Sequence, residues 1–222
     1  FNDNAPTQNH QVSLTGGTDN LQYFLSLGYF SQDGIIGGNY NKSNYDRWSI
    51  RTNTTYTAFE DKTRNYLNKV TIGVNIGYSR AKTRGVEVNS EFGSILGSAV
   101  GMSPLVNVYA TDEEAATLLS AHPYAVKDKN GKVLATPPGA WQELQNPLSM
   151  LNAPENSKTN EDKIVGTFYA QLDVLPGLKF KTSYGADLAF WGTDGYRYPY
   201  YAGTMRDYTT SYVTSEMHRG YR

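Results

Sequence analysis

The sequence predicts an all-β protein whose antiparallel, up-and-down strands form part of the wall of a transmembrane β-barrel. Three observations predict this fold: apolar and polar residues alternate, the alternating segments are long, and short connections alternate with long ones. In "KVTIGVNIGYSRA" (69–81), every second residue from Val70 to Tyr78 is apolar, and the residues between them are small or polar. A period of two puts the apolar side chains on one face of a strand and the polar ones on the other.

The same alternation recurs along the chain, in segments near 11–15, 23–30, 47–58, 164–174 and 178–190, with a weaker seventh strand around Tyr208 to Thr214. The eight steps from Val70 to Tyr78 cover about 26 Å and rise roughly 20 Å at a tilt of about 40°, close to the apolar band of outer-membrane barrels. Soluble strands average about 5–6 residues. Trp48 and Tyr56 lie eight residues apart on one face, which would place one ring at each lipid–water interface. We therefore expect the apolar face to contact lipid rather than the second sheet of a soluble sandwich.

The connections alternate in length. The short ones are "GGTDNL", residues 59–68 and "LPGL", and the long ones are residues 31–46, about 80–162, and the stretch after Phe190. Outer-membrane barrels have short periplasmic turns and long external loops, so residues 80–162 are expected to form a long extracellular loop. Within it, Thr111 and Glu114 predict a capped helix (111–122), Asn130-Gly131 predicts the turn of a β-hairpin, and residues 90–102 predict a short helix.

The polar face carries charges that a sandwich core could not hold cheaply, since each unpaired buried charge costs several kcal/mol. A watery lumen would accept them. The candidate lumen-lining residues are Arg47, Arg51, Asn75, Gln171, Asp173, Lys179, Lys181 and Asp187.

Composition narrows the function classes. The net charge is −1, which gives no reason to expect a nucleic-acid partner, and there is no cysteine to form a disulfide or a thiolate metal site. No run of 18 apolar residues predicts a membrane-spanning helix. The chain opens on Phe1 without a signal-peptide pattern, which is typical of a processed or excerpted chain.

No set of residues predicts catalysis, a metal site or a cofactor. His10, His122 and His218 are scattered, and Glu113 and Glu114 fit the first turn of a helix, where acids complement its dipole. The sequence therefore predicts that the protein is not an enzyme.

Aromatic residues are the remaining candidates for ligand contact. Trp191, Tyr196, Tyr198, Tyr200 and Tyr201 lie at and beyond an external strand end, where they would form either a membrane-interface girdle or a sugar-stacking surface. Trp141 and Tyr124 lie in the long loop, and two roles stay open for them: contact with a ligand, or packing within the loop. The candidate ligand-stacking residues are Trp141, Tyr124, Tyr196 and Tyr198.

Five segments resemble the early barrel strands of SusC-like TonB-dependent outer-membrane transporters (the SusC/RagA family): "NHQVSLTGG" (9–17), "YFLSLGYFSQDGII" (23–36), "NYDRWSIRTN" (44–53), "NPLSML" (146–151) and "GLKFKTSYGADL" (177–188). The resemblance implies a 22-stranded barrel with an N-terminal plug in the outer membrane of a Gram-negative bacterium. It also implies import of glycans or oligopeptides, a SusD-like lipoprotein lid outside, and TonB inside, reached through a plug region that this chain lacks.

Six or seven strands cannot close even the smallest barrel of about 8 strands, so residues 1–222 are expected to be a partial barrel domain without its plug and later strands. Three function classes stay open at this point. The first is TonB-dependent import; the second is a passive porin or an adhesin-like surface module, which needs no plug. The third, an outer-membrane hydrolase, needs a catalytic constellation that the sequence lacks.

Overall fold

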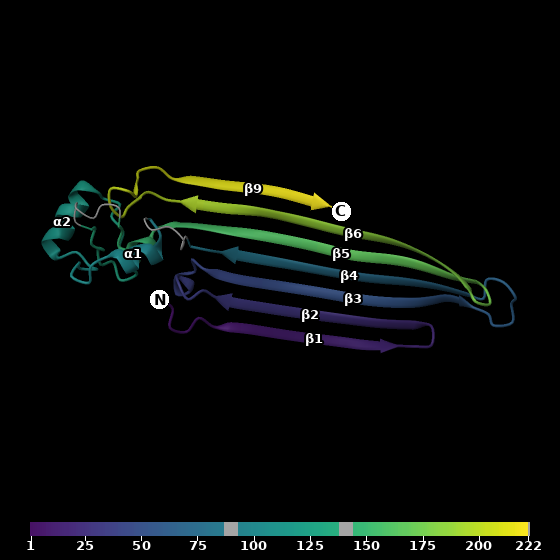
Figure 1. The fold of residues 1–222 in the computed structure, drawn as a ribbon. Helices are drawn as coiled ribbons and strands as arrows, with labels where there is room; N and C mark the ends of the chain where they lie inside the picture. Colours follow the sequence, from purple (N-terminus) through teal and green to yellow (C-terminus); the bar gives the residue numbers. More distant parts are fainter. Residues whose placement is uncertain (87–92, 138–143, 222) are drawn as a thin grey trace.

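A single open sheet dominates the computed structural model, which describes residues 1–86, 93–137 and 144–221. Seven long strands lie side by side in chain order, and each neighbouring pair is antiparallel (Figure 1). They are β1 (Thr7–Gly17), β2 (Leu21–Asp33), β3 (Asn44–Glu60), β4 (Lys69–Arg84), β5 (Glu155–Leu175), β6 (Leu178–Arg197) and β9 (Tyr212–Tyr221). The predicted all-β, up-and-down arrangement is confirmed.

The connections segregate by length as the sequence predicts. Residues 18–20, 61–68 and 176–177 turn at one end of the sheet, and residues 34–43, 85–154 and 198–211 lie at the other. Together the longer connections form a folded lobe at that end (Figure 1). The lobe contains η1 (Gly38–Tyr40), α1 (Ile95–Gly101), α2 (Asp112–Ala121), α3 (Pro147–Asn152) and the short paired strands β7 (Tyr200–Tyr201) and β8 (Asp207–Tyr208).

The strands extend further toward the lobe than the apolar alternation predicts, so the long connection spans 85–154 rather than about 80–162. Polar cross-strand contacts support this extension. Thr159 and Thr193 share a hydroxyl contact of 3.1 Å, and the Asn160 amide donates to Asp194 at 3.0 Å. Strands β5 and β6 therefore continue past the apolar segments that predicted them, into a stretch of polar residues.

The predicted position of the last strand, around Tyr208 to Thr214, is wrong. The strand that joins the sheet is β9 (Tyr212–Tyr221), while Asp207–Tyr208 pairs with β7 in the lobe. Ser215 and Arg219 interrupt the apolar face of β9, and its backbone pairing with β6 defines the strand instead.

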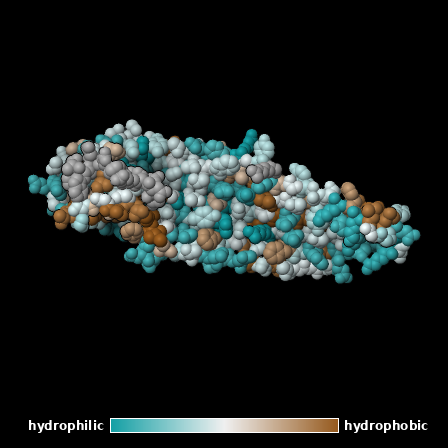
Figure 2. Space-filling model, viewed as in Figure 1, coloured by the Kyte–Doolittle hydropathy of each residue, from teal (hydrophilic) through white to brown (hydrophobic). Residues whose placement is uncertain are grey.

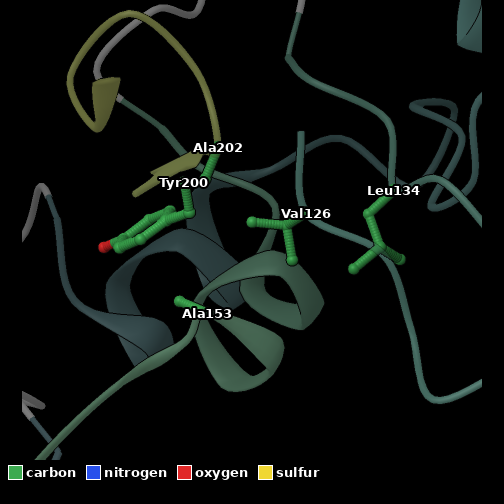
Figure 3. Packing of buried hydrophobic residues seen from close by; sticks show 5 residues of the cluster. All are labelled: Val126, Leu134, Ala153, Tyr200 and Ala202. Carbon is green, nitrogen blue, oxygen red and sulfur yellow. The ribbon is translucent and has the colours of Figure 1, made fainter. Parts of the chain in front are cut away.

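The hydrophobic core lies in the lobe. Among the described residues, every buried apolar side chain belongs to 85–154 or 198–211, in three small clusters. Figure 3 shows the first cluster, in which residues from both connections meet: Val126, Leu134, Ala153, Tyr200 and Ala202. The two connections also share backbone hydrogen bonds, because the Val126 amide donates to the Tyr201 carbonyl at 3.0 Å. The lobe is thus one folded unit built from several loops.

The local predictions for the lobe are confirmed. Thr111 and Glu114 form a reciprocal capping box on α2, and α1 begins after the Ser94 cap. Gly131 adopts a φ of 82°, and the Asp128 amide donates to the Lys132 carbonyl at 2.9 Å across the Asn130-Gly131 turn. Helix α3 was not predicted, although the Asn146 cap followed by Pro147 is a start signal.

None of the described helices is both long and apolar enough to cross a membrane.

Candidate functional site

One face of the sheet is apolar and uncovered. Residues directly opposite each other on neighbouring strands share a face, and the register joins Val12, Leu27, Ile50 and Tyr78 in one such row. Val12 is 71% exposed, Trp48 61% and Tyr184 74%, and the described part of the chain packs nothing over them. A contiguous apolar surface of this kind marks an interface with a partner or a membrane.

Two tyrosines at the lobe end of the apolar face donate hydrogen bonds from their hydroxyls to carboxylates. The Tyr78 hydroxyl donates to Asp162 at 2.6 Å, and the Tyr29 hydroxyl donates to Asp46 at 3.4 Å. The Tyr29 ring also lies 4.5 Å from the Trp48 ring, centroid to centroid. Aromatic rings with an apolar body and a polar tip are typical of the boundary between hydrocarbon and water.

The opposite face is polar, and the register places all eight candidate lumen-lining residues on it. Asn75 lies opposite Asn53 and Thr167, and the other candidates share its face: Arg47, Arg51, Gln171, Asp173, Lys179, Lys181 and Asp187. Figure 2 shows hydrophilic side chains spread along the strands on the side turned to the viewer, while hydrophobic side chains gather on the lower side of the lobe.

Several of these polar residues interact at the end of the sheet away from the lobe. The Lys179 ammonium lies 3.7 Å from the Asp173 carboxylate, and the Gln171 amide donates to the same carboxylate at 3.1 Å. The Lys181 ammonium lies 4.2 Å from the centre of the Tyr169 ring. Tyr169 in turn lies across Gly73 and reaches Thr55, with 3.3 Å between the two hydroxyl oxygens.

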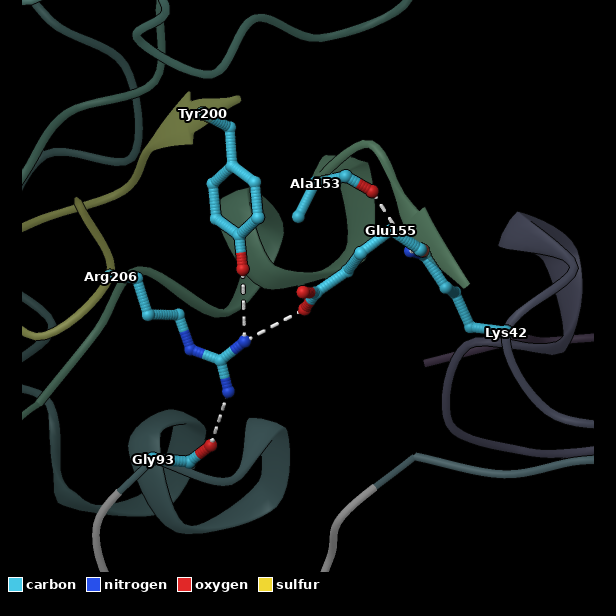
Figure 4. Close-up of polar contacts among 6 residues, drawn as sticks. All are labelled: Lys42, Gly93, Ala153, Glu155, Tyr200 and Arg206. Carbon is cyan, nitrogen blue, oxygen red and sulfur yellow. Dashed lines mark hydrogen bonds and ion pairs between the residues drawn. The ribbon is translucent and has the colours of Figure 1, made fainter. Parts of the chain in front are cut away.

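The lobe is fixed to the sheet by a partly buried polar network that the sequence did not predict (Figure 4). One guanidinium nitrogen of Arg206 donates to the Glu155 carboxylate at 2.9 Å and to the Tyr200 hydroxyl at 3.2 Å. The other terminal nitrogen donates to the Gly93 carbonyl at 3.1 Å. Burial raises the pKa of the Tyr200 phenol, so this hydroxyl stays protonated.

Lys42 approaches the same point from the connection between β2 and β3. Its ammonium donates to the carbonyls of Ala153, at 2.9 Å, and Glu155. Burial lowers the pKa of this ammonium, while the Glu155 carboxylate acts in the opposite direction. Three loops distant in sequence are thus joined at the first residue of β5.

A pocket of about 290 Å³ lies beside this network, lined by Lys42, Glu155, Arg206, Tyr196 and Tyr212 among others. Tyr196 is the one candidate stacking residue in it, and its ring lies 5.6 Å from the Tyr198 ring, centroid to centroid. Tyr124 is exposed on the lobe, away from this pocket. Trp141 lies outside the described residues.

Two members of the predicted aromatic set do not form a membrane-interface girdle. Tyr200 is 1% exposed in the lobe core, so it belongs to neither a girdle nor a stacking surface. Trp191 lies opposite Glu161 and His218, on the polar face, so it does not face the apolar side. The position of Trp191 near a predicted strand end suggested a girdle, but the alternation of side chains along β6 places its ring on the polar face.

The histidines lie apart from one another. His122 stacks on Tyr201 with ring centres 3.6 Å apart, and His218 stacks beside Trp191. Within residues 1–86, 93–137 and 144–221, no group of three His, Cys, Asp or Glu side chains could hold a metal ion.

An antiparallel sheet of long strands in meander order, with a lipid-type apolar face, a polar face and all its long loops at one end, defines the wall of a large outer-membrane β-barrel. Comparisons with known proteins show which barrels the chain is similar to. No family model matches the chain. It is 26% identical over 193 residues to the TonB-dependent receptor SusC of Bacteroides thetaiotaomicron, covering 83% of this chain and 17% of SusC. It is 24% identical over 182 residues to the TonB-dependent receptor P3 of Formosa agariphila, covering 80% of this chain and 15% of P3.

Solved structures agree with the fold. A chain of the RagAB peptide importer in its closed-closed state matches 98% of this chain with a TM-score of 0.58 and 21% identity, over 21% of its own length. A second RagAB structure matches with a TM-score of 0.52. The resemblance to SusC-like TonB-dependent receptors is therefore confirmed, as is the fold class. The chain spans about one sixth of the length of the curated receptors that it matches.

Proposed function

We propose that this chain forms part of the barrel wall of an importer in the outer membrane of a Gram-negative bacterium, energised through TonB. The observation that carries the proposal is the two-faced sheet, whose apolar side chains stay on one side across six strand pairings. A lipid bilayer covers such a face without a second sheet, as it does in outer-membrane barrels. The similarity to TonB-dependent receptors over 80% of the chain supports energised import over passive diffusion.

In this proposal residues 1–222 are a partial barrel domain, and the polar face lines the lumen. The lobe lies outside the cell, because outer-membrane barrels carry their long loops there. Loops on a rigid scaffold are where binding usually resides, so the pocket beside Tyr196, together with Tyr124, Tyr198 and Trp141, is where we expect substrate or a partner to make contact.

The relatives support a proposal for the cargo and the partner. We propose that the whole protein imports glycans or oligopeptides together with a SusD-like lipoprotein lid. RagAB is a peptide importer, which favours oligopeptides, whereas glycans are the class that exposed tyrosines would stack against.

Growth and co-purification test the proposal. The full-length gene is deleted in its own bacterium, and growth is measured on oligopeptides or on glycans as the limiting nutrient, with and without TonB. We expect a growth defect on one class of nutrient, an equal defect when TonB is removed, and a lipoprotein that co-purifies with the tagged protein. Uptake that persists without TonB would contradict the proposal and would fit a passive porin.

A further inference from the structure

Two arginines on the polar face of β3 have no charged or hydrogen-bonding partner in the described part of the chain. Arg47 and Arg51 lie four residues apart on the same face. Among residues 1–86, 93–137 and 144–221, no carboxylate lies within ion-pair distance of either guanidinium, and Arg47 lies over the Phe30 ring, at 5.8 Å. An arginine stays charged at any physiological pH and presents five donors that match a planar anion.

The backbone beside these arginines is left uncovered. Gly77 lies directly opposite Arg51 on β4, and a side chain added there would meet only the Val165 carbonyl, at 3.9 Å. The space is therefore not required by packing of the strands. It opens a hollow of about 220 Å³ lined by Arg47, Ser49, Arg51, Gly77, Tyr78, Ser79, Lys163 and Val165.

A second hollow, of about 150 Å³, adjoins the first on the side of β1 and β2. Arg47, Ser49 and Arg51 line both hollows, so the arginine pair stands between them. Gln11 and Ser26, which form a hydrogen bond of 3.0 Å with each other, line the second hollow. The pair can thus be approached from either side by a group on the polar face.

Two acids of this face pair with lysines: Asp187 lies 3.9 Å from Lys163 and offsets that charge, and Asp173 pairs with Lys179 near the opposite end of the strands. A third acid, Glu161, lies two strands from Arg47 in the same cross-strand row, and among the described residues it forms no ion pair with either arginine. The two arginine charges are therefore not offset by a direct ion pair in the described part of the chain. Guanidinium, ammonium and hydroxyl groups supply donors at this point, which suits a ligand that accepts hydrogen bonds and carries negative charge.

We propose that Arg47 and Arg51 form a cradle for a carboxylate group on the inner wall of the barrel. The carboxylate has two possible sources with the same chemistry: the imported molecule, or a part of the same protein that occupies the lumen. The first source rests on the proposed import function, whereas the cradle itself rests on the geometry of the sheet.

Arginine-specific labelling distinguishes the sources. The purified full-length protein in detergent is treated with phenylglyoxal, and modification of Arg47 and Arg51 is quantified by mass spectrometry relative to Arg84, an arginine that donates to the Asn41 side-chain carbonyl at 2.9 Å and, among the described residues, pairs with no carboxylate. The probes are acetyl-trialanine and D-glucuronate, each beside its neutral counterpart, acetyl-trialanine amide and D-glucose. Protection by an acid and not by its counterpart identifies a carboxylate of the imported molecule. Protection without any probe identifies a carboxylate of the protein. Labelling of both arginines at the rate of Arg84 under every condition overturns the proposal.

Variants provide the second measurement. In Arg47→Gln and Arg51→Gln we expect the affinity for the protecting acid to fall about tenfold or more, since charge-assisted hydrogen bonds contribute roughly 1.5–3 kcal/mol, while any affinity for the neutral counterpart is unchanged. If the carboxylate belongs to the protein, the variants instead lower its thermal midpoint in the absence of a probe. Arg80→Gln is the matched control, because Arg80 is on the adjacent strand but on the apolar face, 3.8 Å from Asp162. Effects of the same size in the control would also overturn the proposal. A wild-type protein that binds acids in the cradle yet supports no import would refute the import function alone.

Discussion

A lysine placed at Val74 or at Asn75 should have opposite consequences, although the two residues are neighbours. Val74 lies on the apolar face of β4, opposite Phe168 and Thr54, and Asn75 lies on the polar face. Val74 is midway between Val70 and Tyr78, so at about 3.3 Å per residue it stands about 13 Å along the strand from each end of the apolar segment. That position corresponds to the middle of the bilayer.

The depth determines the magnitude. A lysine facing lipid at the midplane of an outer-membrane barrel costs about 2–4 kcal/mol, and the cost falls to about 0–1 kcal/mol near the interface. We therefore expect Val74→Lys to lower the free energy of unfolding by about 2–4 kcal/mol. For Tyr78→Lys, the cost of placing the charge at the interface should be about 1 kcal/mol or less. Asn75→Lys, which points into water, should change it by roughly 0.5 kcal/mol or less.

The measurement is urea unfolding of the full-length protein from phospholipid vesicles, followed by tryptophan fluorescence. The amount of each variant that reaches the outer membrane is a second readout. Equal losses for Val74→Lys and Asn75→Lys would refute the assignment of the two faces, and a larger loss at Asn75 would reverse it.

Three further predictions concern the contacts described above. Gly73→Ala should destabilise the sheet by about 1–3 kcal/mol, because the new methyl group would stand 2.0 Å from the Tyr169 ring, and the loss should largely disappear in a Tyr169→Ala background, as a double-mutant cycle would measure. Arg206→Gln should loosen the lobe by about 1–3 kcal/mol, seen as faster limited proteolysis, whereas Arg84→Gln, which removes an exposed contact to Asn41, should not; equal proteolysis rates would contradict this. The Lys132 amide holds the pKa of Asp128 below its usual range, so the turn at 128–132 should stay closed down to about pH 3.9 and open as the pH falls further through the depressed pKa. Pepsin cleavage between pH 5 and 2 measures that opening, and an Asp128→Asn variant with the same pH profile would show that another group is responsible.

The sheet could be predicted from the sequence because each strand is recognised from the alternation of neighbouring residues. Alternation from Val70 to Tyr78 shows both the strand and its two faces, and the eight lumen candidates follow from parity alone. The strand ends could not be predicted in this way. Between Glu155 and Asp162 both faces are polar, so the alternation disappears although the backbone ladder continues.

The lobe contacts could not be predicted, because they join residues far apart in sequence. Lys42 and Arg206 meet at Glu155 through loops that each carry no pattern of their own. A capping box or an Asn-Gly turn is visible within a few residues, which is why α2 and the turn at Gly131 were predicted while the network was not. The arginine cradle is an intermediate case. Its two arginines were predicted to face the lumen, but only the strand register shows that no described acid pairs with them.

The polar extension of β5 beyond Ile164 sets how far the lobe stands from the bilayer. From Ile164 back to Glu155 the strand rises about 30 Å along its own axis, or roughly 23 Å of height at a tilt of about 40°. On the proposed topology, the lobe is therefore held clear of the lipid headgroups and within the carbohydrate layer that coats such cells. Antibodies, phage tail fibres and external proteases would meet the lobe before any other part of the chain, so variation in its exposed residues would alter how an intact cell is recognised while the barrel wall below stayed unchanged.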